Sequence, residues 1–170
     1  MQIALLKNFK SIGTDTANQI LITRFVFLSL LTIWITGFLL PLVSAIDNPL
    51  TNFVMTRFYS TVCHQDSTKC ISIDNNITLV CARCAGIYFG ALIAAISSII
   101  IFHPLTSKKL LLISIIPLLI DVLLVSLGIY SYSKIISFST GMVFGSIIYL
   151  FILTEIEKLI LEQISDSLNE

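Results

Sequence analysis

Four long apolar runs, separated by shorter polar stretches, dominate the order of residues in this chain of 170 residues. The runs cover residues 25–46, 84–103, 109–130 and 135–154. Each run contains about the 20 mostly apolar residues that a helix needs to cross the hydrocarbon core of a bilayer. Because a backbone in lipid must satisfy its hydrogen bonds internally, runs of this length predict helices. The pattern therefore predicts an all-α, polytopic integral membrane protein with four transmembrane helices in a membrane domain over residues 25–154.

Three further segments lie outside these runs. Residues 1–24 form an N-terminal segment, residues 47–83 form a long loop between the first two spans, and residues 155–170 follow the last span. In the loop, apolar residues between Leu50 and Val62 recur at helical spacing, which predicts a short amphipathic helix at the bilayer surface or against the bundle. Apolar residues on both sides of Asp74-Asn75-Asn76 then predict a short β-hairpin.

The last segment, residues 155–170, has an apolar stripe opposite acidic residues and predicts an amphipathic helix. Because its polar face is acidic, we expect it to pack on this protein or on a partner protein rather than on an anionic lipid surface. Small residues four positions apart allow helices to approach closely in lipid. The pairs Gly86/Gly90 and Gly141/Gly145 therefore predict close packing of the second and fourth spans.

The composition supports a membrane protein and excludes one other class. Hydrophobic residues make up 56% of the chain and charged residues only 12%, whereas soluble domains carry about 25% charged residues. The formal net charge is zero, so the chain offers no basic field for nucleic acid. The apolar core of the first span is longer than that of a secretory signal peptide, so we expect this span to be retained although Val43-Ser44-Ala45 resembles a cleavage site.

Positive charges in the connecting segments indicate the orientation. Six lie on the side of the termini, and four lie on the opposite side: Lys7, Lys10, Arg24, Lys108, Lys109 and Lys158 against Arg57, Lys69, Arg83 and Lys134. By the positive-inside rule this excess predicts cytoplasmic termini in an inner or plasma membrane. The loop over residues 47–83 would then face an oxidising compartment, where disulfides persist. In the inverted topology, reduced thiolates and a metal are the stronger expectation.

The cysteines and histidines gather in that loop. The chain has four cysteines and two histidines, and five of these six residues lie between Cys63 and Cys84. Cys81 and Cys84 form a Cys-x-x-Cys pair, which is a frequent half-site for tetrahedral zinc. The other half would come from two of Cys63, His64 and Cys70. If the fourth position is left to water, the metal acts as a Lewis acid.

Two other interpretations fit the same residues. Cys-x-x-Cys is also the spacing of redox dithiols, and Arg83 beside a helix start favours a reactive thiolate, so a thiol–disulfide oxidoreductase that passes electrons to quinone is the first alternative. An even number of cysteines in an exported loop also fits two structural disulfides.

An acidic residue within the third span marks a second candidate position. Asp121 has apolar neighbours along the chain, and a charged group at such a position costs about 2.5–3.5 kcal/mol, so it should face the bundle and have a partner. Its expected depth places it in the same half of the membrane as Cys84. Three hydroxyl residues at the start of the fourth span enter this layer and are positioned to hydrogen-bond to it: Ser137, Ser139 and Thr140. Tyr88 lies one turn below Cys84. Asp121 and Tyr88 are therefore the candidate catalytic residues.

Two motifs carry a family resemblance. They are Cys63-His64-Gln65 and Cys81-Ala82-Arg83-Cys84-Ala85-Gly86-Ile87-Tyr88-Phe89-Gly90. They resemble the signature of a prokaryotic family of membrane proteins known as domain of unknown function 2085, and the resemblance extends from about Phe53 to Leu150. It implies a small polytopic membrane protein whose Cys-His-Gln and Cys-x-Arg-Cys elements belong together, and it brings no established activity.

The chain departs from the family pattern at several positions. Cys70 is additional to the pattern, so the resemblance implies a shared set of Cys63, His64, Cys81 and Cys84 and favours one site over two disulfides. Ser137 stands where the family tends to have an arginine, which leaves Asp121 without an obvious charged partner.

The sequence as a whole predicts a membrane protein with a Cys/His zinc site at the membrane edge, on Cys63, His64, Cys81 and Cys84 with Cys70 as a further candidate. A site at that depth suits a lipid or lipid-linked substrate. The third alternative is a non-enzymatic scaffold or accessory subunit that binds a partner protein through residues 155–170. The sequence names no reaction.

Overall fold

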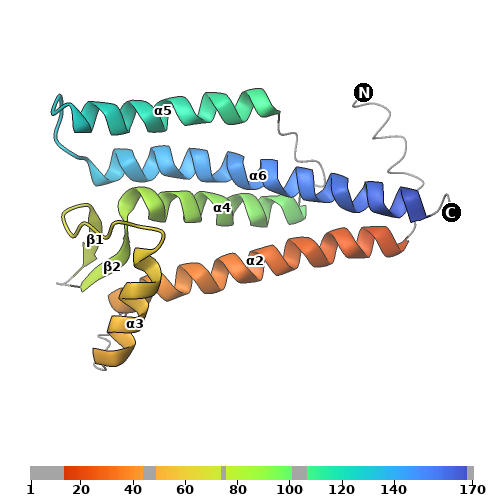
Figure 1. Cartoon of the computed structure of the whole chain (residues 1–170), viewed down its shortest axis with the longest axis horizontal. Helices are drawn as coiled ribbons and strands as arrows, with labels where there is room; N and C mark the ends of the chain where they lie inside the picture. The colour runs from red at the N-terminus through yellow and green to blue at the C-terminus, as the bar shows by residue number, and fades with distance from the viewer. Residues whose placement is uncertain (1–13, 44–48, 74–75, 101–106, 168–170) are drawn as a thin grey trace.

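The computed structural model describes residues 14–43, 49–73, 76–100 and 107–167. Its elements in chain order are α2 (Thr14–Val43), α3 (Pro49–Ser60), β1 (Cys70–Ile73), β2 (Asn76–Cys81), α4 (Ala82–Ile100), α5 (Lys108–Ser126) and α6 (Lys134–Ser167) (Figure 1). Four of these described helices, α2, α4, α5 and α6, are long and apolar enough to cross a membrane. The predicted all-α fold with four transmembrane helices is thus confirmed.

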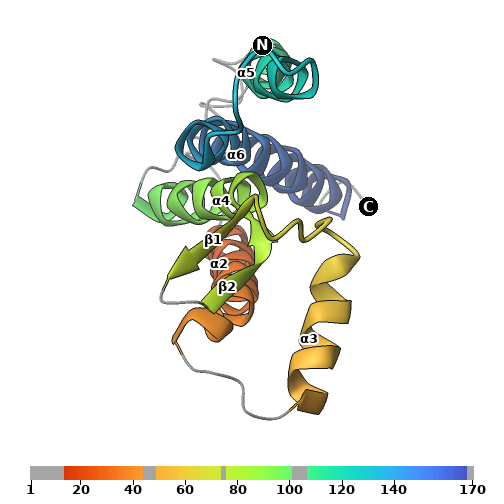
Figure 2. The ribbon, with the colours of Figure 1, turned by 90° about the vertical axis from the view of Figure 1, so that its left-hand side faces the viewer.

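The four long helices lie side by side in the order α5, α6, α4, α2, as both Figure 1 and Figure 2 show. The hairpin of β1 and β2 and the short helix α3 stand together at one end of this bundle. The candidate spans are Asn18–Leu42, Ala82–Ile100, Lys108–Ser126 and Lys134–Ile164. The predicted loop between the first two spans therefore forms a structured cap on one end of the membrane domain.

Helices α4 and α6 pack closely, as the sequence predicted. The contact uses four glycines, Gly86 and Gly90 on α4 and Gly141 and Gly145 on α6. A Cβ atom on Gly90 would run into the carbonyl oxygen of Met142, and one on Gly145 would run into that of Ile87. The Ser146 hydroxyl donates to the Gly90 carbonyl across the same contact, at 2.9 Å. Only glycine allows the two backbones to approach this far.

A buried ion pair joins three helices at the other end of the bundle. Arg24 of α2 is only 1% exposed, and its Nε donates to the Glu157 carboxylate of α6 at 2.7 Å. Its Nη1 donates to the Ser98 carbonyl of α4. Charged side chains within membrane spans need such partners. The sequence placed Arg24 at the cytoplasmic end of the first span and did not predict its partner, Glu157.

Two predicted segments differ in extent from the structure. Helix α2 begins at Thr14, within the predicted N-terminal segment 1–24, and α6 continues without a break through Ser167, so most of the segment 155–170 prolongs the fourth span. Glu157 of that segment faces Arg24 rather than the outside. Residues 1–13 and 168–170, and the Asp74-Asn75 turn of the hairpin, lie outside the described residues.

Candidate metal centre

Three cysteine thiols converge at the end of the bundle that carries the hairpin. The sulfur atoms of Cys63, Cys81 and Cys84 all lie within 4.8 Å of one another. A tetrahedral zinc ion with Zn–S bonds of about 2.3 Å holds its sulfurs roughly 3.8 Å apart. The thiols therefore need to close by at most about 1 Å to share one ion. The three residues come from the turn after α3, the end of β2 and the first turn of α4.

A buried tyrosine positions Cys63. Tyr59 is only 3% exposed, and its hydroxyl donates to the Trp34 carbonyl of α2 at 2.9 Å. The backbone N–H of Cys63 in turn donates to the Tyr59 carbonyl at 3.1 Å, in a turn that closes the end of α3. The anchored tyrosine thus fixes the position where the chain leaves α3, and Cys63 follows directly.

Gln65 fastens the Cys-His-Gln turn to the hairpin. Its side-chain N–H₂ group donates to the Thr56 carbonyl of α3 and to the Leu79 carbonyl of β2, each at 3.0 Å. Its backbone has φ of 52°, a left-handed conformation that a residue other than glycine keeps only when its surroundings hold it. Its N–H is a hydrogen-bond donor to the Cys63 sulfur. Gln65 therefore holds the turn that carries Cys63. The spacing of possible metal ligands in the sequence did not reveal this structural role.

The predicted hairpin is confirmed, and it places Cys81. Strands β1 and β2 pair antiparallel, with Cys70 opposite Cys81 and an irregularity after Cys70. The N–H of Cys81 donates to the Cys63 sulfur at 3.1 Å. Cys70 is also buried, but the group of three close sulfur atoms does not include it. Burial and the neighbouring Cys63 raise the pKa of the Cys70 thiol to about 11, so Cys70 stays protonated.

The surroundings of Cys63 favour its thiolate. Hydrogen bonds from the thiols of Cys81 and Cys84 lower the pKa of the Cys63 thiol, and the backbone N–H groups of Cys81 and Gln65 act in the same direction. Cys84 lies in the first turn of α4, where the partial positive charge of a helix N-terminus favours negatively charged groups. Metal-binding cysteines must be thiolates, so this electrostatic setting suits a cation.

His64, a predicted ligand, is exposed and does not belong to the group of three sulfur atoms. Its backbone follows Cys63 directly, but adjacent side chains leave a turn in different directions. Among the described residues, the structure therefore brings three thiols together in one place, without His64. A coordinating role of His64 stays a prediction.

Asp121 has the charged partner that the sequence did not supply. Its carboxylate is 3% exposed and accepts a hydrogen bond from Arg83 Nη2 at 2.5 Å, one from the Ser137 hydroxyl at 2.8 Å and one from the Tyr130 hydroxyl. The expected hydrogen bond from Ser137 is confirmed. Since Arg83 precedes Cys84, the pair links the thiol cluster to α5 and α6. Asp121 therefore lies at the same end of the bundle as Cys84, as predicted.

Tyr88 lies on another face of α4. Its ring packs against Trp34 and Phe38 of α2, with ring centroids 5.8 and 5.9 Å away. It belongs to the apolar cluster that also contains Cys63 and Cys84. At 100° per residue, Tyr88 is rotated by roughly 140° from Arg83 around the helix axis. Tyr88 and Arg83, the partner of Asp121, thus point to different sides of α4, and the catalytic roles of Tyr88 and Asp121 stay predictions.

Comparison with known proteins shows the family. A family model described as "Predicted membrane protein (DUF2085)" matches residues 63–151, which is more than half of the chain. The chain belongs to this family. An uncharacterized protein of Methanocaldococcus jannaschii is 30% identical over 104 residues, which cover 56% of this chain and 64% of that protein. The chain thus spans less than two thirds of the length of this relative. No solved structure matches.

The segment that matches the DUF2085 family begins at Cys63 and includes Cys81, Cys84 and Asp121. The family segment therefore contains every residue of the thiol cluster as well as the buried acid. Helices α2 and α3 both lie outside it. The match supports a shared membrane fold and names no activity.

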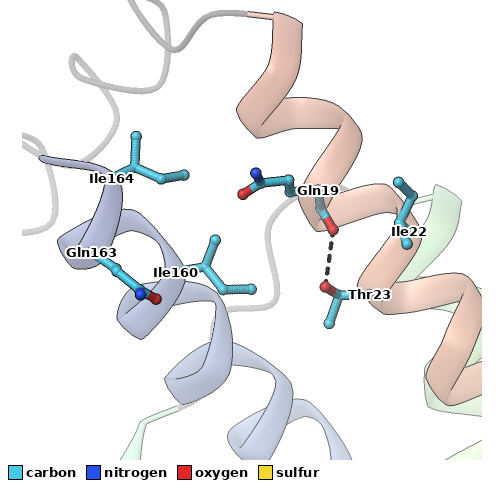
Figure 3. A pocket seen from close by; sticks show the side chains of 6 residues that line it. All are labelled: Gln19, Ile22, Thr23, Ile160, Gln163 and Ile164. Carbon is cyan, nitrogen blue, oxygen red and sulfur yellow. Dashed lines mark hydrogen bonds between the residues drawn. The ribbon is translucent and has the colours of Figure 1, made fainter. Parts of the chain in front are cut away.

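One cavity lies far from this chemistry. It measures about 530 Å³ and sits between the first turns of α2 and the last turns of α6, the ends opposite to the hairpin (Figure 3). Gln19 and Thr23 line it from α2, and Gln163 and two isoleucines line it from α6. All its lining side chains are uncharged, and the Thr23 hydroxyl donates within its own helix to the Gln19 carbonyl. The described residues that line this cavity offer no group for acid–base or metal chemistry.

Proposed function

We propose that this DUF2085 protein binds a zinc ion on Cys63, Cys81 and Cys84 at the membrane edge, and that the ion faces a lipid or lipid-linked substrate. The observation that carries the proposal is the convergence of three sulfur atoms within 4.8 Å. Thiolates are soft ligands, and a compact sulfur set in a tetrahedral arrangement is typical of zinc.

The open fourth position gives the site its chemistry in this proposal. Catalytic zinc sites keep three protein ligands and leave one position to water or substrate. A zinc ion held by these cysteines would supply Lewis-acid chemistry. The catalytic roles predicted for Tyr88 and Asp121 belong to the proposal. Because Cys84 lies in the first turn of a membrane span, a substrate would reach the ion from the membrane edge.

Metal analysis of detergent-purified protein tests the zinc site. In reduced, chelator-free preparations we expect about one zinc ion per chain, and Cys84→Ser should lower this content by about tenfold or more. Cys70→Ser is the matched control, because Cys70 is a buried cysteine outside the group of three and should leave the zinc content unchanged. Absence of stoichiometric metal, or an equal loss in the Cys70→Ser variant, would refute the site. Loss of zinc in His64→Ala would identify His64 as the fourth ligand.

A thiol–disulfide oxidoreductase is the second candidate, favoured by the closeness of the Cys81 and Cys84 sulfur atoms, which lie within 4.8 Å of each other. In that reaction Cys81 and Cys84 form a disulfide, and their two electrons and two protons reduce a quinone to quinol. The thiol count per chain would then fall by two after quinone addition and recover in dithiothreitol. A count that never changes excludes this activity.

The scaffold alternative relies on residues 155–170. Glu157 of this segment is buried against Arg24, so its carboxylate serves an internal contact. Exposed residues such as Leu159, which is 63% exposed, are what the segment offers to a partner. Substitution Leu159→Glu should release a partner protein that co-purifies with the wild type; unchanged co-purification argues against the scaffold.

A further inference from the structure

An apolar groove runs along the membrane spans below the thiol cluster. It has a volume of about 260 Å³ and lies between α2, α4 and α6. Leu31 of α2, Ala91 of α4 and Ile152 of α6 represent the three walls. Ala91 has the smallest side chain of the lining residues, so a larger side chain at this position would fill part of the groove.

The groove is aligned with Cys84. Ile87, Tyr88 and Ala91 line it from α4, and they follow Cys84 at three, four and seven positions along the chain. Residues at these spacings share one face of an α-helix. A molecule that lies in the groove therefore points one end at the thiols, past the ring of Tyr88.

The lining determines what the groove accepts. All residues that line it are apolar or aromatic, and they belong to membrane-spanning helices. A buried water needs two to four polar partners, whereas apolar cavities of about 150 Å³ bind molecules such as benzene. At about 260 Å³ the groove has room for a segment of a hydrocarbon chain. The surrounding bilayer supplies such chains.

We propose that this groove binds the acyl or prenyl chain of a lipid whose head group then lies at the thiol cluster. This inference rests on the proposed function, since it identifies where the substrate's chain is held. Tyr88 stands between the two parts, because it lines the groove and belongs to the apolar cluster around Cys63 and Cys84. The groove selects for a long apolar chain, and the cluster acts on the polar end.

Photo-crosslinking with a phospholipid that carries a diazirine in its acyl chain tests this assignment in purified, zinc-loaded protein. We expect labelled peptides to concentrate on the groove walls, for example around Leu31 and Ile152. Ala91→Phe fills part of the groove and should lower this labelling by about tenfold. Ile152→Trp narrows the rim at a residue that is 46% exposed, so it serves where the Ala91 variant does not fold. Ile93→Phe, on the opposite face of α4 and 54% exposed, is the matched control and should leave labelling unchanged.

Three outcomes would overturn the proposal. Labelling spread evenly over exposed residues such as Ile116 of α5 would indicate only the surrounding lipid. Labelling of the groove walls that is lost when the chain forms a dimer would assign the groove to a protein contact. Unchanged labelling in both groove variants would exclude the site as well. If zinc content stays intact in these cases, the groove assignment fails alone, whereas absence of zinc from the wild type removes the proposed function.

Discussion

The Arg83–Asp121 ion pair should be the strongest single link between the thiol cluster and helices α5 and α6. Asp121 is only 3% exposed and accepts three hydrogen bonds. Removing one partner of a buried ion pair costs about 3–5 kcal/mol, because the other charge stays buried without compensation. The Arg83 side chain is 23% exposed, so water solvates part of its charge. We therefore expect Asp121→Leu to lower the free energy of unfolding by about 3 kcal/mol.

A double-mutant cycle with Arg83→Met isolates the pair. Replacing both partners by apolar groups leaves no unpaired charge, so the double variant should lose less stability than the two single variants together. We expect a coupling energy of about 2 kcal/mol. Ser137→Ala removes one hydrogen bond to the carboxylate and should cost about 1–2 kcal/mol, which gives a graded control.

Unfolding in detergent micelles measures these values. The chain has a single tryptophan, Trp34, whose indole packs against Tyr59 and Tyr88, so its fluorescence reports on the contact between α2 and the cysteine cap. A coupling energy below about 0.5 kcal/mol between Arg83 and Asp121 would refute the reasoning, because distant and independent sites already reach that value.

Three further predictions use the same unfolding and metal assays. In an exposed helix, Gly→Ala stabilises by about 0.8–1 kcal/mol, but Gly90→Ala should destabilise by about 1–3 kcal/mol because the Met142 carbonyl blocks its Cβ; a stabilised variant would contradict the close approach of α4 and α6. Arg24→Gln should cost about 3 kcal/mol because it leaves Glu157 buried without its cation, and a loss below about 1 kcal/mol would show that the pair is not formed. Gln65→Leu removes two hydrogen bonds that hold the Cys-His-Gln turn and should lower zinc content by about tenfold or more; unchanged zinc would show that the turn does not depend on them.

The membrane fold could be predicted because lipid imposes strict rules on sequence. Runs of about 20 apolar residues have few alternatives to spanning helices, and glycines four residues apart predicted which two helices approach most closely. The hairpin was also predictable, since its turn residues separate two short apolar stretches. Each of these features depends on residues that are close together in the chain.

The polar contacts within the bundle were harder to predict because they depend on how distant helices face one another. Arg83 lies 38 residues before Asp121, and nothing local to either residue shows that their faces meet. The sequence instead assigned Arg83 to the activation of a neighbouring thiol. One feature of the sequence could have indicated the pair: Arg83 lies at the start of the second span, at the depth expected for Asp121.

The Arg24–Glu157 pair illustrates the same limit. Glu157 was assigned to a polar outer face, yet it continues a buried stripe of α6 that also contains Tyr149 and Leu153, at intervals of four residues. That periodicity was visible in the sequence. The partner was not, because Arg24 lies 133 residues away, on a helix whose rotation only the packed structure defines.

The cysteine site was partly predictable for a similar reason. Cys81 and Cys84 share a local spacing, and the hairpin returns Cys81 to the turn that carries Cys63. The sequence could not show which of Cys63, His64 and Cys70 complete the site, because that depends on where each side chain points. The turn after α3 sets the directions of Cys63 and His64, and the pairing of β1 with β2 sets that of Cys70.

X-ray absorption spectroscopy at the zinc edge of the purified protein decides whether the thiols bind the metal, because it counts the sulfur atoms around the ion. We expect a shell of about three sulfurs at about 2.3 Å together with one lighter atom. The sulfur count should fall to about two in any zinc that Cys84→Ser retains. A spectrum with only oxygen and nitrogen neighbours would contradict a metal centre on Cys63, Cys81 and Cys84.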